Sequence, residues 1–323
     1  MKILIVQLGR IGDLILLTPM FSALKEKFPE CEIDVFAGRN NYKILENNPL
    51  INNIIVFEKS FFGYLKTLFK IYSNKYDYYI DPKDHHSTES KIFASINRSK
   101  NKIGYNFNEK IFNIEIPIPQ RSLHHSEIGL NALSPLGIKL PDKQIKPKLF
   151  VNKENNQYLQ DFLNKNNINE YYAINLSAST TDRMWNNERW EKLLKNSAPS
   201  KTKFIICCSP KEKSQAIELS SKIQNSIYFQ TRDINDVVAL IANSSAVITP
   251  DTAIVHIAAA FNKPLFALYN GIEPAYNKFY PLSDYYISIQ APKDDFGIQK
   301  IEMDYAIEKL IEFFNSTFAK QSQ

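Results

Sequence analysis

The sequence predicts an α/β protein of two domains, each built around a doubly wound parallel sheet. Three observations carry this prediction. Short apolar runs alternate with helical apolar spacing along the whole chain, which is the pattern of repeated βαβ units. A chain of 323 residues is longer than one ordinary core accommodates. A charged, proline-flanked stretch at 141–148 interrupts the alternation, so we expect a domain boundary near residue 150.

The N-terminal half opens with an apolar run at 3–8, as expected for a parallel strand covered on both faces. Helical apolar spacing then extends from Leu14 to Phe28. The alternation continues with strands at 33–37, 54–57, 78–80 and 102–105 and helices at 61–72, 87–96 and 124–136. Prolines interrupt 114–118, so we expect an edge strand or a connector there.

The C-terminal half repeats this alternation without a strong sequence repeat. We expect strands at 172–176, 203–208, 226–229, 246–249 and 264–268 and helices at 188–196, 211–224, 234–243 and 252–261. An amphipathic helix at 304–318 closes the chain. Its spacing leaves open whether it stays with the C-terminal domain or packs back on the N-terminal one.

Composition narrows the class of partner. The net charge is +5 and the basic residues are spread along the chain, which favours an anionic substrate or membrane surface over nucleic acid. Cys31, Cys207 and Cys208 have neither zinc-site nor disulfide spacing. The first residues lack a signal-peptide pattern, and no apolar run approaches a membrane span. We therefore expect a cytoplasmic protein, either free or peripheral on a membrane.

The stretch 248–260 combines the end of a buried strand, a tight polar turn and a helix of small apolar residues. Asp251 and Thr252 lie where the first backbone N–H groups of that helix lack internal partners. These groups and the helix dipole favour negative charge. His256 lies four residues after Thr252, so its ring can lean toward the same end. The turn is a candidate phosphate site; the alternative interpretation is a capped helix with a core-facing histidine.

A second turn, Gly9-Arg10-Ile11-Gly12-Asp13, follows the first strand. Its spacing is neither that of the dinucleotide fingerprint nor that of a Walker A loop. It combines a flexible turn with a carboxylate just after the carboxyl end of the strand. Asp13 is either the cap of the following helix or a general base that projects into an inter-domain cleft.

The polar loop at 177–185 follows a strong strand, where ligands collect in such sheets. Its hydroxyls and its one arginine can hold phosphate oxygens. The candidate donors are Ser177, Ser179, Thr180 and Arg183. The alternative is an ordinary polar loop with Trp185 as a packing anchor.

Glu212 begins the helix after the 203–208 strand. A first-turn acid there either offsets the helix dipole or accepts hydrogen bonds from two ribose hydroxyls. The histidine pairs at 85–86 and 124–125 resemble metal ligands, but adjacent residues point in different directions and no acidic cluster accompanies them. A D-x-D triplet for a nucleotide-bound metal is also missing from the sequence, so we expect no metal site.

Aromatic residues and lysines alternate at 61–72. The first interpretation is a partly buried amphipathic helix. The alternative is a helix that faces an anionic membrane interface, where lysines beside aromatic rings are favoured.

Several of these motifs occur together and in order. They are Gly12-Asp13-Leu14-Ile15-Leu16-Leu17-Thr18-Pro19, Tyr76-Asp77-Tyr78-Tyr79-Ile80-Asp81, Ile103-Gly104-Tyr105, Arg183-Met184-Trp185, Asp251-Thr252 with His256, and Leu268-Tyr269-Asn270-Gly271. With them the chain resembles, over nearly its whole length, the family-9 glycosyltransferases, the ADP-heptose:lipopolysaccharide heptosyltransferases and their relatives.

The resemblance implies a GT-B fold, in which two Rossmann-like domains face each other across a cleft. The acceptor would bind to residues 1–150 and the nucleotide-sugar to 151–323. It also implies an inverting transfer without a metal or cofactor. The expected reaction moves a sugar, heptose from ADP-heptose, onto a lipopolysaccharide core or a related bacterial surface glycan. An anionic inner-membrane surface is a further candidate partner.

The matching positions imply a role for each site residue. Asp13 would be the general base, Arg183 would neutralise the donor phosphates, and Glu212 would bind the ribose. Asp251 would contact the sugar, Thr252, Ala253 and Ile254 would offer backbone N–H groups to the diphosphate, and His256 would lie beside them. On the acceptor side the candidates are Arg10, Gly12, Lys83, His85 and His86.

The sequence departs from the family pattern at two places. Ala253 stands where the family commonly has glycine, which costs little in a right-handed conformation and strains the backbone at positive φ. The segment 82–86 replaces a Leu-Gln-Gly-like stretch, so the acceptor can differ from the standard inner-core sugar. Two alternatives stay open: a GT-B enzyme that uses another nucleotide-sugar as a transferase or epimerase, and a non-catalytic relative that binds nucleotide or glycan.

Overall fold

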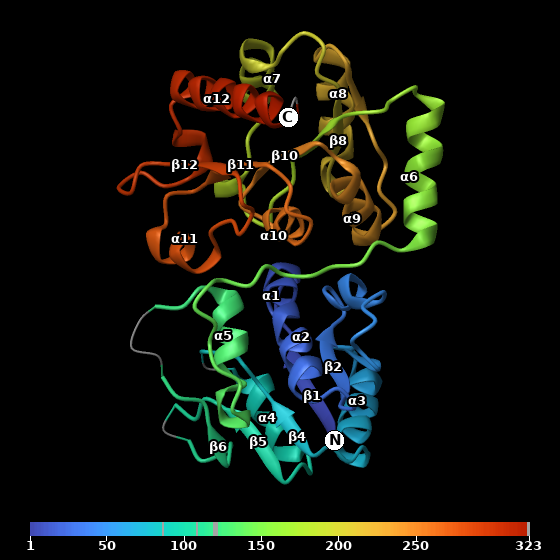
Figure 1. Cartoon of the computed structure of the whole chain (residues 1–323), viewed down its shortest axis with the longest axis vertical. Coiled ribbons are helices and arrows are strands. Elements are labelled where there is room, and N and C mark those ends of the chain that lie inside the picture. Colours follow the sequence, from blue (N-terminus) through green and yellow to red (C-terminus); the bar gives the residue numbers. More distant parts are fainter. Residues whose placement is uncertain (86, 108, 119–121, 322–323) are drawn as a thin grey trace. The chain divides into compact units, whose positions relative to one another are not determined.

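The computed structural model of the chain describes residues 1–85, 87–107, 109–118 and 122–321. The chain folds into two compact units, Met1–Leu149 and Phe150–Gln323. Each unit contains a six-stranded sheet in which every pairing between described strands is parallel. The predicted α/β fold with two doubly wound sheets is confirmed (Figure 1).

The sheet of the N-terminal unit has the strand order β3-β2-β1-β4-β5-β6. Its strands are β1 (Lys2–Gln7), β2 (Glu32–Gly38), β3 (Asn53–Phe57), β4 (Tyr78–Ile80), β5 (Asn101–Gly104) and β6 (Ile114–Glu115). Its helices are α1 (Ile11–Leu16), α2 (Thr18–Lys27), α3 (Phe61–Ser73), α4 (Thr88–Ile96) and α5 (His125–Asn131), with 3₁₀ turns at Tyr42–Leu45 and Ser134–Leu136. The proline-flanked strand β6 lies at the sheet edge, as expected for a strand that cannot donate on both sides.

The sheet of the C-terminal unit has the order β12-β11-β10-β7-β8-β9. Its strands are β7 (Tyr172–Asn175), β8 (Phe204–Cys207), β9 (Ser226–Tyr228), β10 (Ala246–Pro250), β11 (Leu265–Tyr269) and β12 (Tyr286–Gln290). Its helices are α6 (Lys153–Lys165), α7 (Asn187–Ser197), α8 (Lys213–Lys222), α9 (Ile234–Asn243), α10 (Ala253–Ala260), α11 (Glu273–Phe279) and α12 (Met303–Gln321), and 3₁₀ turns lie at Thr181–Arg183, Pro210–Glu212 and Ile298–Lys300.

The two units share one topology although their sequences show no strong repeat. In each sheet the chain starts at an inner strand, adds two strands on one side, and then crosses to the other side. The reversal falls between β1 and β4 in the first unit and between β7 and β10 in the second. In doubly wound sheets, ligands bind outside the carboxyl ends of the strands at this reversal, which fixes where each unit's site is sought.

The single helix expected from Leu14 to Phe28 is wrong, because the chain forms α1 and α2 with a break at Leu17. Pro19 lacks the N–H that a continuous helix would direct at the Ile15 carbonyl. The Thr18 hydroxyl donates to that carbonyl instead, at 2.7 Å. The helix expected at 124–136 is likewise divided, because α5 ends at Asn131 and Pro135 lies in a separate 3₁₀ turn at Ser134–Leu136 that Gly137 caps.

Three elements have no counterpart in the prediction: α6, α11 and β12. Helix α6 is mostly polar and buries only Asn155, Leu159 and Leu163, so its apolar spacing is weak. Its start is fixed by Asn152, whose side chain accepts a hydrogen bond from the Glu154 N–H at 2.8 Å. Strand β12 lies at the sheet edge and is only partly buried. Its sequence therefore lacks the continuous apolar run by which an inner parallel strand is recognised.

The last helix, α12, covers the sheet of its own unit. Leu310, Phe313 and Phe314 lie in the core that β7, β8 and β11 share, and the Phe313 ring stacks on Tyr285 with the ring centroids 5.8 Å apart. Trp185 is buried in the same core and donates its indole N–H to the Ile298 carbonyl at 2.7 Å. This packing fixes the end of the polar loop that follows β7.

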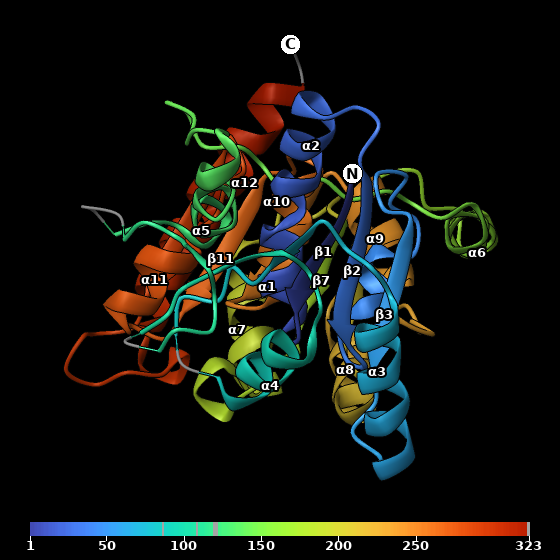
Figure 2. The same ribbon diagram turned by 90° about the horizontal axis from the view of Figure 1, so that it is seen from below.

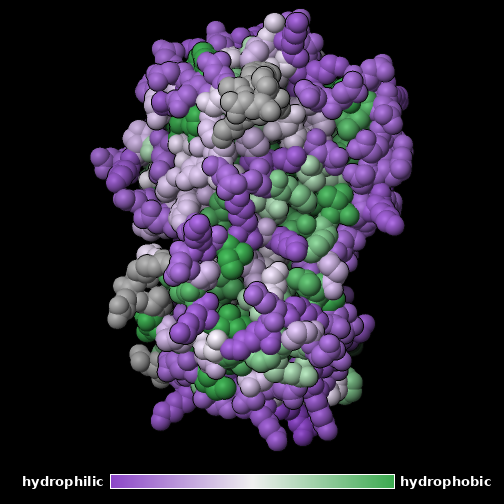
Figure 3. All heavy atoms as spheres, viewed as in Figure 1, coloured by the Kyte–Doolittle hydropathy of each residue, from purple (hydrophilic) through white to green (hydrophobic). Residues whose placement is uncertain are grey.

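The surface of the view in Figure 3 is largely hydrophilic. None of the helices in the described ranges combines the length and the hydropathy that a membrane span requires. Cys207 and Cys208 are buried as expected, and desolvation raises the pKa of the Cys207 thiol to about 12.

Candidate functional site

In the C-terminal unit the predicted donor residues lie on loops that leave the carboxyl ends of β7, β8 and β10. Strands β7 and β10 are parallel neighbours, with Ile174 opposite Ile248, so the loops after them start side by side. Strand β8 pairs with the other edge of β7. The topology thus places the loop at 177–183, Glu212 and the Asp251 turn at one edge of one sheet, at its point of reversal.

Arg183 and Asp251 form an ion pair at this edge. The Arg183 Nη1 lies 3.0 Å from the Asp251 Oδ2 and 3.5 Å from the Asp251 carbonyl oxygen. Both side chains are largely buried. The Arg183 Nε is buried and has no hydrogen-bond partner in the described part of the chain. Because a guanidinium carries five donors, this pairing leaves further N–H groups for a ligand anion.

A second pair joins Ser177 and Glu212. The Ser177 hydroxyl donates to the Glu212 Oε2 at 2.9 Å and accepts from the Ser209 N–H at 2.6 Å. The Ser209 hydroxyl also donates to the same carboxylate oxygen. Two of the predicted donor residues therefore meet, and the hydroxyl of Ser177 is already engaged by protein groups.

The remaining loop residues are more open. Ser179 and Thr180 are exposed at the loop tip. Desolvation raises the pKa of Asp182, but hydrogen bonds from Thr180 and Asn270 outweigh it and hold that pKa below its usual value. Asn270 donates to the Asp182 Oδ2 at 2.6 Å, which ties the loop after β11 to the loop after β7.

Helix α10 begins beside Asp251 with Thr252 as its N-cap. The Thr252 Oγ1 accepts from the Ile254 N–H at 3.2 Å, so that N–H is already satisfied. The Ala253 N–H has no hydrogen-bond partner in the described part of the chain. Of the three backbone donors expected for a diphosphate, the Ile254 N–H is thus engaged, whereas those of Thr252 and Ala253 have no partner in the described part of the chain.

Ala253 occupies the first turn of α10 and is not among the described residues with positive φ. Alanine therefore adopts the backbone conformation at this position without the strain that positive φ would impose.

Replacing Ala253 with glycine should not tighten nucleotide binding, because alanine fits the backbone that is present. The same change should lower the free energy of unfolding by at most about 1 kcal/mol, through the greater freedom of glycine in the unfolded chain. Calorimetric titration of nucleotide and thermal unfolding of Ala253→Gly would check both. A gain in affinity of about tenfold or more would show instead that the methyl group obstructs the ligand.

His256 is buried one turn further along α10, with its ring centroid 6.2 Å from that of Phe279 in α11. The His256 ring therefore faces the core, which was the alternative interpretation of the sequence. Gly271 closes the Leu-Tyr-x-Gly motif with a φ of 88°, and a Cβ there would lie 2.5 Å from the Ala291 carbonyl oxygen. That motif is explained by a backbone position that only glycine fills without strain.

In the N-terminal unit, Asp13 lies in the first turn of α1, just past β1. Its Oδ2 accepts the Arg10 N–H at 3.0 Å. One carboxylate oxygen therefore caps the helix, which is the first of the two roles considered for Asp13. Within the described residues Oδ1 has no hydrogen-bond partner and remains able to accept a proton. The capping bond and a catalytic role are therefore compatible.

Further contacts hold the loop before Asp13. The Asn41 side chain, from the segment after β2, donates to the Gln7 carbonyl at 3.1 Å and to the Gly9 carbonyl at 2.9 Å. The Gln7 side chain accepts the Gly9 N–H at 3.0 Å. Sequence reasoning did not identify Gln7 or Asn41, because asparagine and glutamine carry no motif until the sheet brings them together.

The other acceptor-side candidates lie on the loops after β1 and β4, which are adjacent strands of the same sheet. Arg10 is exposed, and Gly12 lies in the first turn of α1. Lys83 donates its Nζ to the Ser87 hydroxyl at 3.2 Å, and the His85 Nδ1 lies 3.3 Å from the Asp84 Oδ1. His86 lies outside the described residues.

Asp81 is a buried carboxyl at the end of β4 that sequence reasoning used only as part of a motif. Burial raises its pKa, and hydrogen bonds from the Ser90 hydroxyl and the Lys83 N–H oppose that rise. These bonds fix the loop that carries Lys83 and His85.

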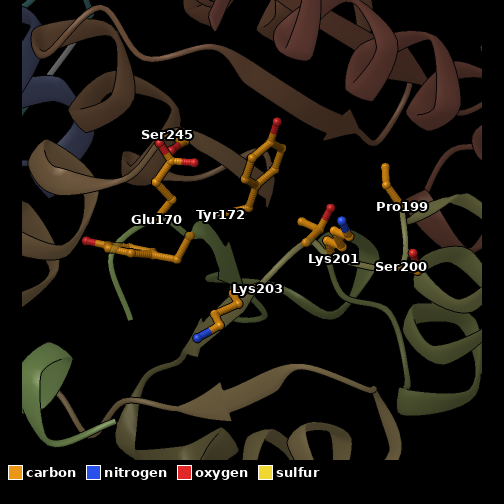
Figure 4. A pocket seen from close by; sticks show the side chains of 9 residues that line it. Glu170, Tyr172, Pro199, Ser200, Lys201, Lys203 and Ser245 are labelled. Atoms are coloured by element: carbon orange, nitrogen blue, oxygen red, sulfur yellow. The ribbon is translucent and has the colours of Figure 1, made fainter. Parts of the chain in front are cut away.

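A hollow of about 450 Å³ opens elsewhere, at the amino ends of β7, β8 and β10. Figure 4 shows Glu170, Tyr172 and Lys203 among its lining side chains. It contains none of the predicted donor residues and lies at the sheet edge opposite theirs, so it is not the donor site. In the described part of the chain no three His, Cys, Asp or Glu side chains cluster as a metal site would require.

Two doubly wound units in one chain are the architecture of the GT-B class of glycosyltransferase. The model of glycosyltransferase family 9 (heptosyltransferase) matches residues 65–306. The chain belongs to this family, and the predicted resemblance is confirmed.

Individual relatives agree with this assignment. Lipopolysaccharide heptosyltransferase 3 of Escherichia coli is 23% identical over 287 residues, which cover 81% of each chain. Among solved structures, E. coli ADP-heptose lps heptosyltransferase II superposes with a TM-score of 0.81 and 19% identity over 100% of both chains. E. coli heptosyltransferase WaaC with ADP-2-deoxy-2-fluoro heptose superposes with a TM-score of 0.77 and 17% identity, covering 97% of this chain and 99% of that one. This protein is accordingly a glycosyltransferase with the fold of these enzymes.

Proposed function

We propose that this protein transfers heptose from ADP-heptose to a hydroxyl of a lipopolysaccharide core or a related bacterial surface glycan. The observation that carries the proposal is the Arg183–Asp251 pair beside the start of α10. It gathers a cation, a carboxylate and an available backbone N–H at the point of a doubly wound sheet where ligands bind. The curated relative is named a lipopolysaccharide heptosyltransferase, and one structural neighbour was solved with an ADP-heptose analogue.

In the proposed reaction the acceptor hydroxyl attacks the anomeric carbon of the donor sugar. The bond from that carbon to the diphosphate breaks, ADP leaves with the bonding electrons, and Asp13 receives the hydroxyl proton. A single displacement of this kind inverts the anomeric configuration. The new linkage should therefore have the opposite configuration to the donor, as NMR of the product would show.

The charge that grows on ADP is stabilised by groups of the protein. In this proposal the terminal N–H groups of the Arg183 guanidinium that do not bind Asp251, together with the Ala253 N–H, would donate to the phosphates, and fixed donors of this kind need no rearrangement when charge develops. The proposal assigns this role to these residues without a metal or cofactor. Asp251 directs the guanidinium and contacts the sugar, and Glu212 accepts the ribose hydroxyls.

The acceptor is a lipid-linked glycan in this proposal, so the reaction takes place at the cytoplasmic face of the inner membrane. Arg10, Gly12, Lys83 and His85 are the proposed acceptor contacts. Their charges suit phosphates or carboxylates on the glycan.

A calorimetric panel of ADP-, UDP- and GDP-linked sugars tests the donor. We expect ADP-heptose to bind at least about tenfold more tightly than the UDP- and GDP-sugars. A preference for a UDP-sugar would overturn the heptose assignment and favour another transferase or an epimerase. Tight ADP-heptose binding without turnover in the presence of acceptor extract would favour a non-catalytic relative.

A further inference from the structure

Helix α3 carries a stripe of large apolar side chains that its own unit leaves uncovered. Five residues of the stripe are 48% to 80% exposed: Phe61, Phe62, Leu65, Phe69 and Tyr72. Elsewhere in the described part of the chain, exposed large apolar side chains are scattered, with at most two on any one element. Contiguous apolar surface of this kind marks an interaction site, whereas single exposed residues do not.

The stripe is continuous along the helix. At 3.6 residues per turn, the five side chains fall within an arc of about 100° on one face of a helix about 20 Å long. Gly63, Thr67 and Ile71 occupy the opposite, buried face. Figure 2 shows α3 along the outside of β3, so the uncovered face points away from the sheet.

Local contacts hold α3 in this orientation. The Ser60 side chain caps the helix by accepting the Gly63 N–H at 3.1 Å. A Cβ at Gly63 would lie 2.6 Å from the Glu58 Cβ, so glycine permits the close approach of the preceding strand. The Thr67 hydroxyl donates to the Gly63 carbonyl at 2.7 Å. The apolar stripe is therefore presented by a fixed helix.

The charged side chains of α3 itself are all basic. Lys66 and Lys70 lie on the flank between the apolar stripe and the buried face, both exposed, and within the described residues neither has an ion-pair partner. Helix α3 contains no acidic residue. Beyond its end, the Arg98 guanidinium lies 5.1 Å from the Tyr72 ring centroid. Lys59, before the helix, forms an ion pair with Glu89 of α4 at 3.3 Å.

We propose that α3 is the surface by which this protein binds an anionic lipid bilayer. A helix of this type lies in the plane of the interface, with its apolar face buried among the headgroups and acyl chains. Phenylalanine, leucine and tyrosine on the stripe would enter that layer, while Lys66 and Lys70 would meet the anionic headgroups. The cationic flank and the absence of acid on the helix favour a lipid surface over an apolar groove of a protein partner.

The proposal is independent of the sugar donor and acceptor, because it concerns binding without turnover. Sedimentation of the full-length protein with vesicles tests it. We expect binding to vesicles of phosphatidylethanolamine with phosphatidylglycerol, weaker binding to phosphatidylcholine alone, and a loss of binding as salt concentration rises.

Two variants address the two halves of the surface. Phe62→Ser with Phe69→Ser should lower vesicle binding by about tenfold or more, because it removes two of the inserting rings. Lys66→Glu with Lys70→Glu should lower binding to the anionic vesicles only. Ile217→Ser on α8 is the matched control, since Ile217 is 47% exposed on a different helix, and its binding should equal that of the wild type.

Unchanged melting temperatures would show that the variants fold. Vesicle binding by Phe62→Ser with Phe69→Ser equal to the wild type would overturn the proposal. So would a wild-type dimer in light scattering that the same variant converts to a monomer, because the stripe would then be an interface between copies of this chain.

Discussion

Asp13→Asn should lower the rate of sugar transfer by about 10²–10⁴-fold, the usual contribution of a general base. Nucleotide affinity should not change, because the donor residues belong to the other unit. Asparagine is the informative substitution, since its side-chain oxygen can still accept the Arg10 N–H that Asp13 binds at 3.0 Å. It keeps the helix cap and removes the base. Single-turnover transfer, calorimetric titration of nucleotide and thermal unfolding give the three readouts.

Asp13→Ala separates the two roles of the carboxylate further. It should lose transfer as the asparagine variant does and also lose about 0.5–2 kcal/mol of stability with the cap. Asp142→Asn, at an exposed site of the same unit, is the matched control and should behave as the wild type. Full transfer by Asp13→Asn would remove Asp13 from the role of base.

Arg183→Ala should weaken ADP-heptose binding and lower the rate of transfer by about 10²–10³-fold, because it removes the cation aimed at the leaving diphosphate. It should also lower stability by about 1–3 kcal/mol, since the largely buried Asp251 carboxylate loses its ion pair with the guanidinium. Arg183→Lys keeps the charge but not the planar fork, so its activity should lie between those of the alanine variant and the wild type.

A double variant distinguishes the two effects of Arg183. Arg183→Ala combined with Asp251→Ala should recover part of the lost stability, because the buried carboxylate that lost its guanidinium is then removed as well, and should not recover transfer. Recovery of transfer in the double variant would mean that Arg183 serves only to neutralise Asp251. Thermal unfolding and initial rates with ADP-heptose measure the two quantities.

The sequence predicted the architecture because both sheets consist of buried parallel strands, whose apolar runs are evident along the chain. It placed Asp13, Glu212 and Asp251 at the ends of strands for the same reason. It missed the break between α1 and α2, although Pro19 marks it, because the apolar stripe continues across the break.

The side-chain contacts between loops could not be predicted from the sequence. The Arg183–Asp251 contact joins residues 68 apart, and it exists because β7 and β10 are neighbours in the sheet. The sequence left open whether this helix start is capped or free to bind an anion, since the choice depends on the rotamer of the Thr252 hydroxyl, which takes the Ile254 N–H. The contact between Asn270 and Asp182 likewise depends on a loop conformation that no local pattern encodes.

Transfer itself is the most direct test of the central claim that this protein is a heptosyltransferase with Asp13 as its base. Purified protein would be incubated with ADP-heptose and lipopolysaccharide from a strain that lacks heptose, and the glycan would be analysed by mass spectrometry. The account predicts the gain of one heptose with the wild type and only a trace with Asp13→Asn. Absence of any gain with ADP-heptose, together with sugar transfer from a UDP- or GDP-linked donor, would contradict it.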